Sequence, residues 1–439
     1  MFDVPVQPGP GYDQAETFRA GLGCPVRRLV KLHRRPLDFP LHVWGARIDP
    51  EAEEALPESR RRFIASGIGL SSGDARAAAF GEGLERYTFW TTNETLSRRP
   101  AEPLPDWVTE DTLFDLPFLL PPEMDRRRWA RAARRAKARC LPARRTDGEG
   151  RGSRVEMPVE IELDGEHFSL FQTTNGLACG IGFEDAAARA LREVIERDAL
   201  MLVWLYRTSG APLSGDTVLP SALRRMSAMM AARGVNIVLR DISTEFGYCV
   251  VLAIAVARVN GEPLYAFGAG ASSSPGAAAS HAFTEACLSW KAATWRSAFH
   301  DFGVDHEPER EETPRSFAEH ADFYRGAEGY EQVRFLLGDS AEEGGAEAPE
   351  AQYGSDTAGG GIDAPPALGK RPTYALDLTP SDVAQSGGCV VKVVVPGLLP
   401  LTLGDQGCVE LARARLPAKI GGRCLEPGLP INTAPHPWP

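Results

Sequence analysis

The stretch at residues 173–198, TTNGLACGIGFEDAAARALREVIERD, constrains the fold more than any other part of the chain. It opens on small and Gly-rich residues, which allow turns with positive φ and let a ligand approach the backbone closely. It then continues as an Ala-rich helix that carries Glu193, Glu196 and Arg197. Because residues three and four apart share a helix face, both carboxylates and the guanidinium are predicted to project together.

A second E-x-x-E-R helix lies about a hundred residues earlier, where Glu82, Glu85 and Arg86 repeat the spacing. Two such helices can converge on one hydrated Mg²⁺, because hard cations take oxygen ligands, and the adjacent arginines would then face phosphates. The alternative is that each Glu–Arg pair is a surface salt bridge, which stabilises a solvated helix by roughly a few tenths of a kcal/mol. The apolar context of both helices favours the site, because buried acids need partners.

The composition restricts the class of protein. A chain of 439 residues with 43% hydrophobic residues can bury a large core, as one large domain or two to three small ones. Its net charge of −11 gives no reason to expect nucleic-acid binding. The eight cysteines are scattered without a C-x-x-C or Cys/His cluster, which predicts free thiols in a reducing cytoplasm. No signal peptide is evident and no apolar run approaches the ~18 residues of a membrane span, so we expect a soluble cytoplasmic protein with no membrane segment.

Periodicity and turn signals predict an α+β fold in which strand pairs alternate with helices on one face of a sheet. An N-terminal extension, residues 1–65, precedes a helix whose N-cap is predicted at Ser72 or Asp74. The Asn-Gly of VNGE at 259–262 predicts a hairpin between two apolar strands. The predicted strands lie at 27–32, 39–48, 155–163, 167–172, 235–242, 248–258, 264–270, 374–379 and 389–398, and two further helices begin near 221 and 277.

Three segments differ in composition from the rest of the chain. The stretch at 126–139 is strongly basic and is interpreted as a solvated helix or insertion, with a nucleic-acid, membrane or acidic-leader-peptide surface as the alternatives. Residues 339–368 are rich in Gly, Ala, Pro and Glu and are predicted to be a disordered loop. Residues 430–439 are a Pro-rich tail, ending in PHPWP, with stiff polyproline character.

Five ordered motifs carry a resemblance to a known family: the pair of E-x-x-E-R helices, the TTNGLACG turn, and the segments at 268–286, 374–383 and 390–404. On these residues the chain resembles the YcaO family of ATP-dependent enzymes that modify peptide backbones. The resemblance covers residues 66–439 and implies one catalytic domain of mixed sheets, with helices packed around a central nucleotide site. The PHPWP tail is similar to that of the azoline-forming branch. HADFY at 320–324 resembles a short family motif, with helix surface as the alternative.

The resemblance also implies which residues form the site. The implied metal ligands are Glu82, Glu85, Asp185, Glu193 and Glu196. The implied nucleotide-binding residues are Ala79, Arg86, Asn175, Arg197, His281 and Glu285. Pro439 is implied to act in catalysis, through a terminal carboxylate that serves as a base or positioning group. The chain departs from the family pattern with Ala79 in place of Ser, Asp185 in place of Glu, His281 in place of Arg, and Leu288 in place of Gln.

By this resemblance we expect an ATP- and Mg²⁺-dependent cyclodehydratase that forms thiazoline or oxazoline rings from Cys, Ser or Thr of a ribosomally made precursor peptide. A separate E1-like protein is expected to bind the leader peptide, whereas a flavin dehydrogenase partner and a homodimer are left open. Two alternatives remain, namely backbone thioamide or amidine formation within the same family, and a non-catalytic docking subunit of a synthetase complex. The changes at Ala79, His281 and Leu288 keep the docking subunit open, while the intact acidic residues argue against it.

Overall fold

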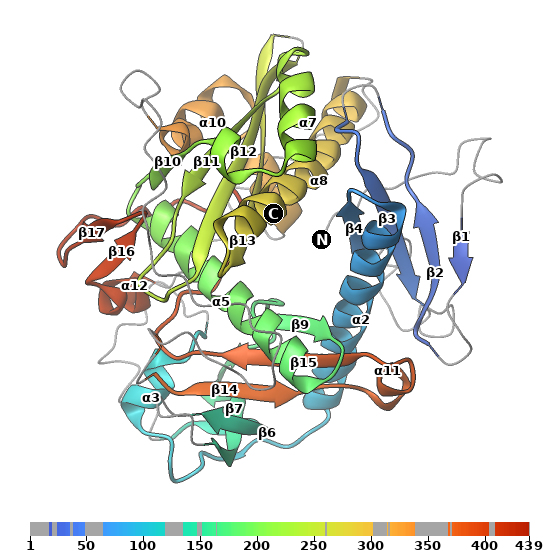
Figure 1. The fold of residues 1–439 in the computed structure, drawn as a ribbon. Coiled ribbons are helices and arrows are strands. Elements are labelled where there is room, and N and C mark those ends of the chain that lie inside the picture. The colour runs from blue at the N-terminus through green and yellow to red at the C-terminus, as the bar shows by residue number, and fades with distance from the viewer. Residues whose placement is uncertain are drawn as a thin grey trace.

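The computed structural model describes residues 17–19, 24–35, 38–48, 65–118, 135–146, 152–163, 165–259, 261–301, 314, 317–338, 368, 371–403 and 409–438 (Figure 1). The described residues form four antiparallel sheets, of which one has only two short strands; the three larger sheets are arranged around three long helices, and each packs against at least one of them. The three helices are α2 (Ser72–Ser97), α5 (Phe183–Leu205) and α8 (Pro275–Asp301).

The first sheet is N-terminal and packs against α2, at the right of Figure 1. Its strands follow the order of the chain: β1 (Thr17–Arg19), β2 (Val26–Lys31), β3 (His42–Ile48) and β4 (Ala65–Gly69). Val26 and Trp44 are buried in one apolar cluster with Ala75 and Leu84 of α2. The domain boundary predicted between residues 65 and 66 therefore lies at the first residue of β4, inside a sheet whose strands share a core with α2.

The second sheet is formed around the predicted hairpin, which the structure confirms as β12 and β13. Its strands are β10 (Ala211–Leu213), β11 (Asn236–Asp241), β12 (Cys249–Val259) and β13 (Glu262–Ser272). Alternate residues of β12 face opposite sides of the sheet. Val250 and Leu252 pack on the side of α5. Val251 and Ala253 pack on the other side, against α7 (Ser221–Ala231) and α8. The prediction of helices on one face is wrong for this sheet, because the unbroken apolar run of β12 leaves no face for solvent.

The third sheet contains the two buried strands predicted near the end of the chain. Its order is β8-β7-β6-β14-β15-β9, with β5 paired to β6, and α5 packs against β9 and β15. Its strands are β5 (Glu102–Pro103), β6 (Lys137–Thr146), β7 (Gly152–Leu163), β8 (Glu166–Ser169), β9 (Leu177–Gly180), β14 (Thr373–Asp377) and β15 (Cys389–Val394). The remaining elements are α3 (Glu110–Asp115), α6 (Gly215–Val218), α9 (Phe317–Phe323), α10 (Gly326–Val333), η3 (Arg334–Leu337), α11 (Ser381–Gln385), α12 (Val409–Arg415), β16 (Ala418–Ile420) and β17 (Arg423–Leu425).

The same close contact joins a strand to a long helix in all three units. A Cβ placed on the strand glycine would lie 2.1–2.5 Å from a helix backbone nitrogen, at Gly67 against Ala79, Gly180 against Ala186 and Gly268 against Ala286. No side chain other than hydrogen fits at such a contact, because real Cβ atoms do not come this close to backbone atoms. The glycines and the Ala-rich helix faces therefore set how near each helix lies to its sheet.

Two local predictions differ from the structure. The N-cap of α2 is Ser71, whose side chain accepts a hydrogen bond from the Asp74 nitrogen, because Ser71 is the last residue with extended backbone angles. The basic stretch at 126–139 is not helical where the structure describes it, since residues 137–139 begin β6. Its residues 126–134 lie outside the described residues, as do residues 339–367 and Pro439.

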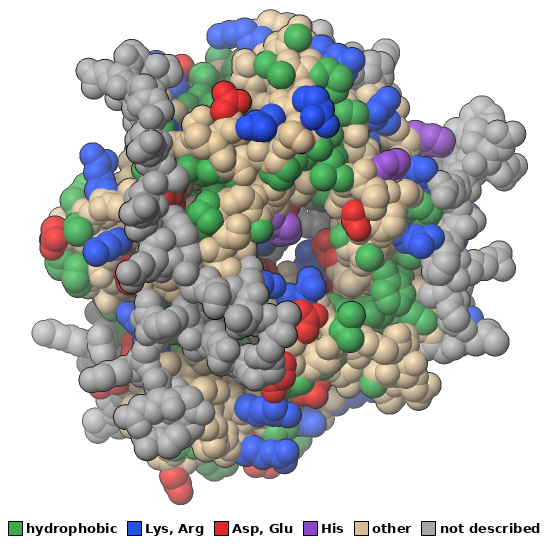
Figure 2. Space-filling model, in the orientation of Figure 1, with side chains coloured by type: hydrophobic (Ala, Val, Ile, Leu, Met, Phe, Trp, Pro, Cys, Tyr) green, Lys and Arg blue, Asp and Glu red, His purple; other side chains and the backbone are tan. Residues whose placement is uncertain are grey.

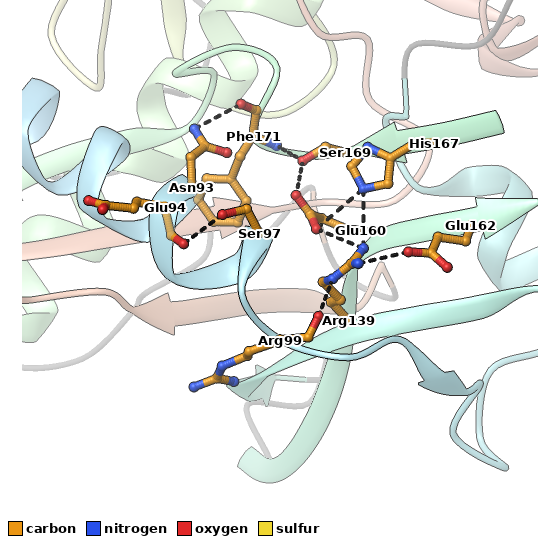
Figure 3. Close-up of polar contacts among 10 residues, drawn as sticks. All are labelled: Asn93, Glu94, Ser97, Arg99, Arg139, Glu160, Glu162, His167, Ser169 and Phe171. Carbon is orange, nitrogen blue, oxygen red and sulfur yellow. Dashed lines mark hydrogen bonds and ion pairs between the residues drawn. The ribbon is translucent and has the colours of Figure 1, made fainter. Parts of the chain in front are cut away.

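Cross-strand charge pairing explains why the end of the basic stretch forms a strand. Figure 3 shows the Arg139 guanidinium between two carboxylates of β7, 3.4 Å from Glu160 Oε2 and 2.7 Å from Glu162 Oε1. His167 of β8 lies on the same cluster, and Arg139 Nε donates to the Arg99 carbonyl at 2.7 Å. These opposite charges on neighbouring strands stabilise the sheet register, which a helix at this point would lose.

We predict that Gly268→Ala lowers the free energy of unfolding by about 1–3 kcal/mol, because the new methyl group would meet backbone atoms of α8 that cannot move aside. Urea denaturation followed by circular dichroism measures this. The matched control is Gly152→Ala, where the Cβ would lie 3.9 Å from its nearest neighbour and the change should stay within about 0.5 kcal/mol. Equal stability of the two variants would contradict the close-contact argument.

Candidate functional site

A cavity of about 1340 Å³ lies where the three sheet–helix units meet. Figure 2 shows this face of the molecule hollowed at its centre, with acidic, basic and histidine side chains around the opening. The predicted site residues that line the cavity are Glu82, Glu85, Arg86, Asn175, Asp185, Glu193, Glu196, Arg197, His281 and Glu285. Ala79 is fully buried under β4 and is not among the lining residues, whereas Leu288 is.

Helix α2 contributes one wall, and its charged side chains bind the segment that follows Thr173. Arg86 Nη2 donates to Glu82 Oε1 at 3.0 Å, and Arg86 Nη1 donates to Thr174 Oγ1 at 2.6 Å. Glu85 Oε1 accepts a hydrogen bond from the Cys179 backbone nitrogen at 2.6 Å. The Glu82–Arg86 pair expected of a solvated helix is thus present, but it faces the cavity and connects the two sequence motifs.

Helix α5 contributes the second wall. Arg197 lies between two carboxylates, with Nε 3.6 Å from Glu193 Oε1 and Nη1 3.8 Å from Glu196 Oε1. The Glu196 side chain is only 7% exposed, although it carries an ionisable group. Arg197 is therefore held in position by the acids that flank it, and it faces the same space as Arg86.

The acidic residue at the start of α5 has a structural partner. Asp185 Oδ2 accepts a hydrogen bond from the Ile181 nitrogen at 2.9 Å, and Asp185 Oδ1 pairs with Arg189 Nε at 3.1 Å. Both contacts are typical of a carboxylate in the first turn of a helix, which the helix dipole stabilises. The Asp185 carboxylate therefore already has partners in the turn before α5 and on α5 itself, and its predicted role as a metal ligand stays a proposal.

Helix α8 contributes the third wall through His281 and Glu285. The Ala269 nitrogen of β13 donates to Glu285 Oε2 at 3.1 Å, which fixes this carboxylate against the second sheet. The charge of Glu285 also raises the pKa of Glu196, so the carboxylates of α8 and α5 are close enough to interact.

The acids of the cavity are buried with too little positive charge nearby, and this raises their pKa values. Burial, followed by the nearby charge of Glu82, raises the pKa of Glu85 to about 8. Burial also raises the pKa of Glu196 to about 7, although Arg197 opposes the rise. Burial raises the pKa of Glu193 as well. A divalent cation fits this site because it would supply the missing positive charge.

The carboxylates do not form a compact metal cage on their own. Among the described residues, no group of three or more His, Cys, Asp or Glu side chains is close enough to hold a metal ion. Mg²⁺ usually keeps several waters and binds through one or two carboxylates together with substrate phosphates. The residues therefore fit Mg²⁺ bound with a nucleotide rather than a bare metal ion.

Two further residues at or beside this site were not predicted from the sequence. Lys392 of β15 lies behind the cavity wall, where it is buried and donates to the Asn175 carbonyl at 2.6 Å. Burial lowers its pKa to about 8, while Glu193 acts in the opposite direction. A lysine inside the apolar run CVVKVVV is itself a signal, because lysine is almost never buried without a partner. Trp438 lines the cavity directly, and no local pattern predicts that position.

The chain matches the family model described as a YcaO cyclodehydratase, ATP- and Mg²⁺-binding, over residues 66–399. The chain belongs to the YcaO family. The predicted family, the fold class and the cofactors ATP and Mg²⁺ are therefore confirmed.

Solved structures share the fold of this YcaO protein at low sequence identity. YcaO from Methanopyrus kandleri, bound with AMPPCP and Mg²⁺, has a TM-score of 0.53 at 19% identity, over 85% of this chain and 86% of that one. The E. coli microcin synthetase McbBCD complex has a TM-score of 0.56 at 13% identity, over 87% and 91%. A heterocyclase in complex with substrate and cofactor has a TM-score of 0.60 at 17% identity, over 93% and 55%.

An uncharacterized protein of Methanothermobacter thermautotrophicus is 28% identical over 253 residues, which are 55% of this chain. The match spans 60% of the length of that curated relative.

Within the part of the chain that the structure describes, no helix has the length and hydrophobicity needed to cross a bilayer.

We predict that binding of Mg²⁺ with a non-hydrolysable ATP analogue releases protons near pH 7. Glu85 and Glu196 are partly protonated there, since their pKa values are about 8 and about 7, and a metal ligand must be deprotonated. Affinity should therefore rise as the pH increases from 6 to 8. Titration calorimetry in two buffers with different ionisation enthalpies measures the released protons.

The control for this titration is Glu94→Gln, which removes an exposed carboxylate of the same helix, paired only on the surface with Arg98. It should leave proton release unchanged, whereas Glu85→Gln should reduce it. A binding enthalpy that does not depend on the buffer would contradict the raised pKa values.

Proposed function

We propose that this YcaO protein is an ATP-dependent cyclodehydratase that forms thiazoline or oxazoline rings in a ribosomally made precursor peptide. The observation that carries this proposal is the convergence of three helices, with their acids and arginines, on one cavity that the Pro-rich tail also lines through Trp438. The tail supports ring formation over thioamide or amidine formation, because PHPWP is similar to the tail of the azoline-forming branch.

In the proposed reaction the thiol or hydroxyl of Cys, Ser or Thr adds to the carbonyl carbon of the preceding residue and loses its proton. This addition closes the ring. The former carbonyl oxygen, once phosphorylated, leaves as phosphate, the amide nitrogen loses its hydrogen, and the existing C–N bond becomes C=N, so that the peptide loses one water. When bound, ATP supplies the phosphoryl group and Mg²⁺ neutralises charge on the phosphates.

The residues of this chain have distinct roles in the proposal. Glu82, Glu85, Glu193 and Glu196 would hold Mg²⁺, and Asp185 is proposed to assist from the start of α5. Arg86 and Arg197 are held by neighbouring carboxylates in orientations suited to phosphate oxygens. His281 and Glu285 extend the phosphate site from α8, while Asn175 shapes the turn beside it. Pro439, which follows Trp438, is proposed to act at the same cavity.

Partners remain part of the proposal. One solved relative is a synthetase complex and another is that complex with pro-MccB17 bound, which supports a precursor peptide and a separate leader-binding protein for this chain as well. A flavin dehydrogenase and a homodimer stay open.

A cytoplasmic location is proposed because the seven described cysteines are all free thiols.

The burial of the acids argues against a non-catalytic docking subunit. Carboxyl groups in a low-dielectric environment are unfavourable unless a cation compensates them, so a subunit that binds no nucleotide has no physical reason to bury Glu85, Glu193 and Glu196 together. Retention of these costly residues favours an enzyme.

We predict that the protein, with its leader-binding partner, ATP and Mg²⁺, releases one phosphate for each water mass lost from the peptide. Phosphate assays and mass spectrometry measure the two quantities. Glu196→Gln should lower both by about a hundredfold or more, because changes to groups that merely support metal ligands already cost about 10- to 100-fold. Glu94→Gln should leave both rates unchanged.

The other outcomes separate the alternatives. Consumption of ATP without loss of water would indicate thioamide or amidine chemistry. Binding of the partner and the peptide without binding of ATP would indicate a docking subunit.

A further inference from the structure

The segment 434–438, here called the tail segment, is held by side chains from two helices that are remote in the sequence. Trp204 of α5 donates from Nε1 to the Ala434 carbonyl at 2.7 Å. The Tyr324 hydroxyl, directly after α9, donates to the Pro435 carbonyl. His320 of α9 lies with Nδ1 2.6 Å from the His436 carbonyl. Three consecutive carbonyls thus each accept a hydrogen bond from a side chain.

The prolines explain why side chains supply these bonds. Pro435 and Pro437 have no N–H group, so the tail segment cannot join a sheet as an ordinary strand. Its carbonyls nevertheless lie among buried residues, since His436 and Trp438 are each only 1% exposed. Buried carbonyls need donors, and in this segment the donors come from Trp204, Tyr324 and His320.

The rings of His320 and His436 stack on each other, and their surroundings favour the neutral form of both. Their rings lie 4.3 Å apart at an angle of 25°, and His436 Nε2 lies 2.9 Å from the Thr402 carbonyl. Burial lowers the pKa of His320, and it lowers the pKa of His436 well below its usual range, with His320 and Arg197 acting in the same direction on His436. Because a carbonyl can only accept, Nδ1 of neutral His320 carries the proton and donates it to the His436 carbonyl.

Trp438, the last residue of the tail segment, connects the segment to the cavity. Trp438 packs edge-on against Phe267 at 5.0 Å and against Trp204 at 6.4 Å, and it forms part of the cavity wall together with Arg197. A shift of the tail segment would therefore change the shape of the cavity beside a guanidinium that the proposed function assigns to phosphate.

We propose that His320 and Tyr324 are positioning residues that hold the tail segment against α5, so that Trp438 completes the wall of the cavity beside Arg197. This gives the HADFY motif a role, because its His and its Tyr are two of the three side-chain donors. The structural part stands on the contacts above, and only its consequence for ring formation rests on the proposed function.

The test uses the full chain labelled with 5-fluorotryptophan, in which the Trp438 resonance is assigned by its loss in Trp438→Phe. In His320→Leu and Tyr324→Phe we expect this ¹⁹F resonance to move towards the position of an unfolded chain and to narrow. With peptide and partner present, kcat for ring formation should fall by about tenfold, the effect of one buried hydrogen bond, while KM for ATP stays within about twofold.

Two matched variants separate positioning from simple loss of packing. His320→Asn has the same number of side-chain heavy atoms and the same branching as His320→Leu but keeps an N–H donor near the position of Nδ1, so it should restore the Trp438 resonance and much of kcat. Tyr206→Phe removes a bond of the same kind, to the Ala412 carbonyl in the same core, and should leave the Trp438 resonance in place.

An unchanged Trp438 resonance in both His320→Leu and Tyr324→Phe would overturn the proposal, as would equal effects of His320→Asn and His320→Leu. Because the ¹⁹F measurement needs no turnover, failure of the proposed function is distinguishable. A wild-type chain that forms no ring, with a Trp438 resonance that still moves in the variants, rejects the reaction but supports the positioning role.

Discussion

The architecture depends on one kind of contact, in which a strand glycine lies directly against the backbone of an Ala-rich helix. It occurs at Gly67 with α2, at Gly180 with α5 and at Gly268 with α8. Since neither side presents a bulky side chain, the helix lies close to its sheet, and the longer residues of the helix are left to face the centre of the molecule. The three helices that carry the acidic residues are the three that make this contact.

The position of the helices brings several carboxyl groups together in one cavity, where protonation or a bound cation relieves the cost of burying their charge. Carboxyl groups from α2, α5 and α8 face one cavity, and burial raises the pKa values of Glu85, Glu193 and Glu196. Arg86, Arg197 and Lys392 supply part of the compensating charge. A divalent cation would supply the positive charge that the acids still lack, which agrees with the family to which the chain belongs.

The tail segment is joined to the site through α5. Trp204 belongs to the same helix as Glu196 and Arg197, and it both donates to the tail and packs against Trp438. A helix that carries the acids thus also anchors the segment that closes part of the cavity. Any change that moves this helix would alter both the charged wall and the aromatic wall together.

Helical periodicity and turn chemistry act over a few residues, so the amino-acid pattern is enough to predict the three helices and to put Glu193, Glu196 and Arg197 on one face. The pattern is also enough to predict the hairpin of β12 and β13 and, by resemblance, the family. It does not predict that N-terminal strands share a core with α2, that Lys392 donates to the Asn175 carbonyl, or that His320 meets a carbonyl 116 residues away. These contacts depend on how distant segments pack, which no local pattern encodes.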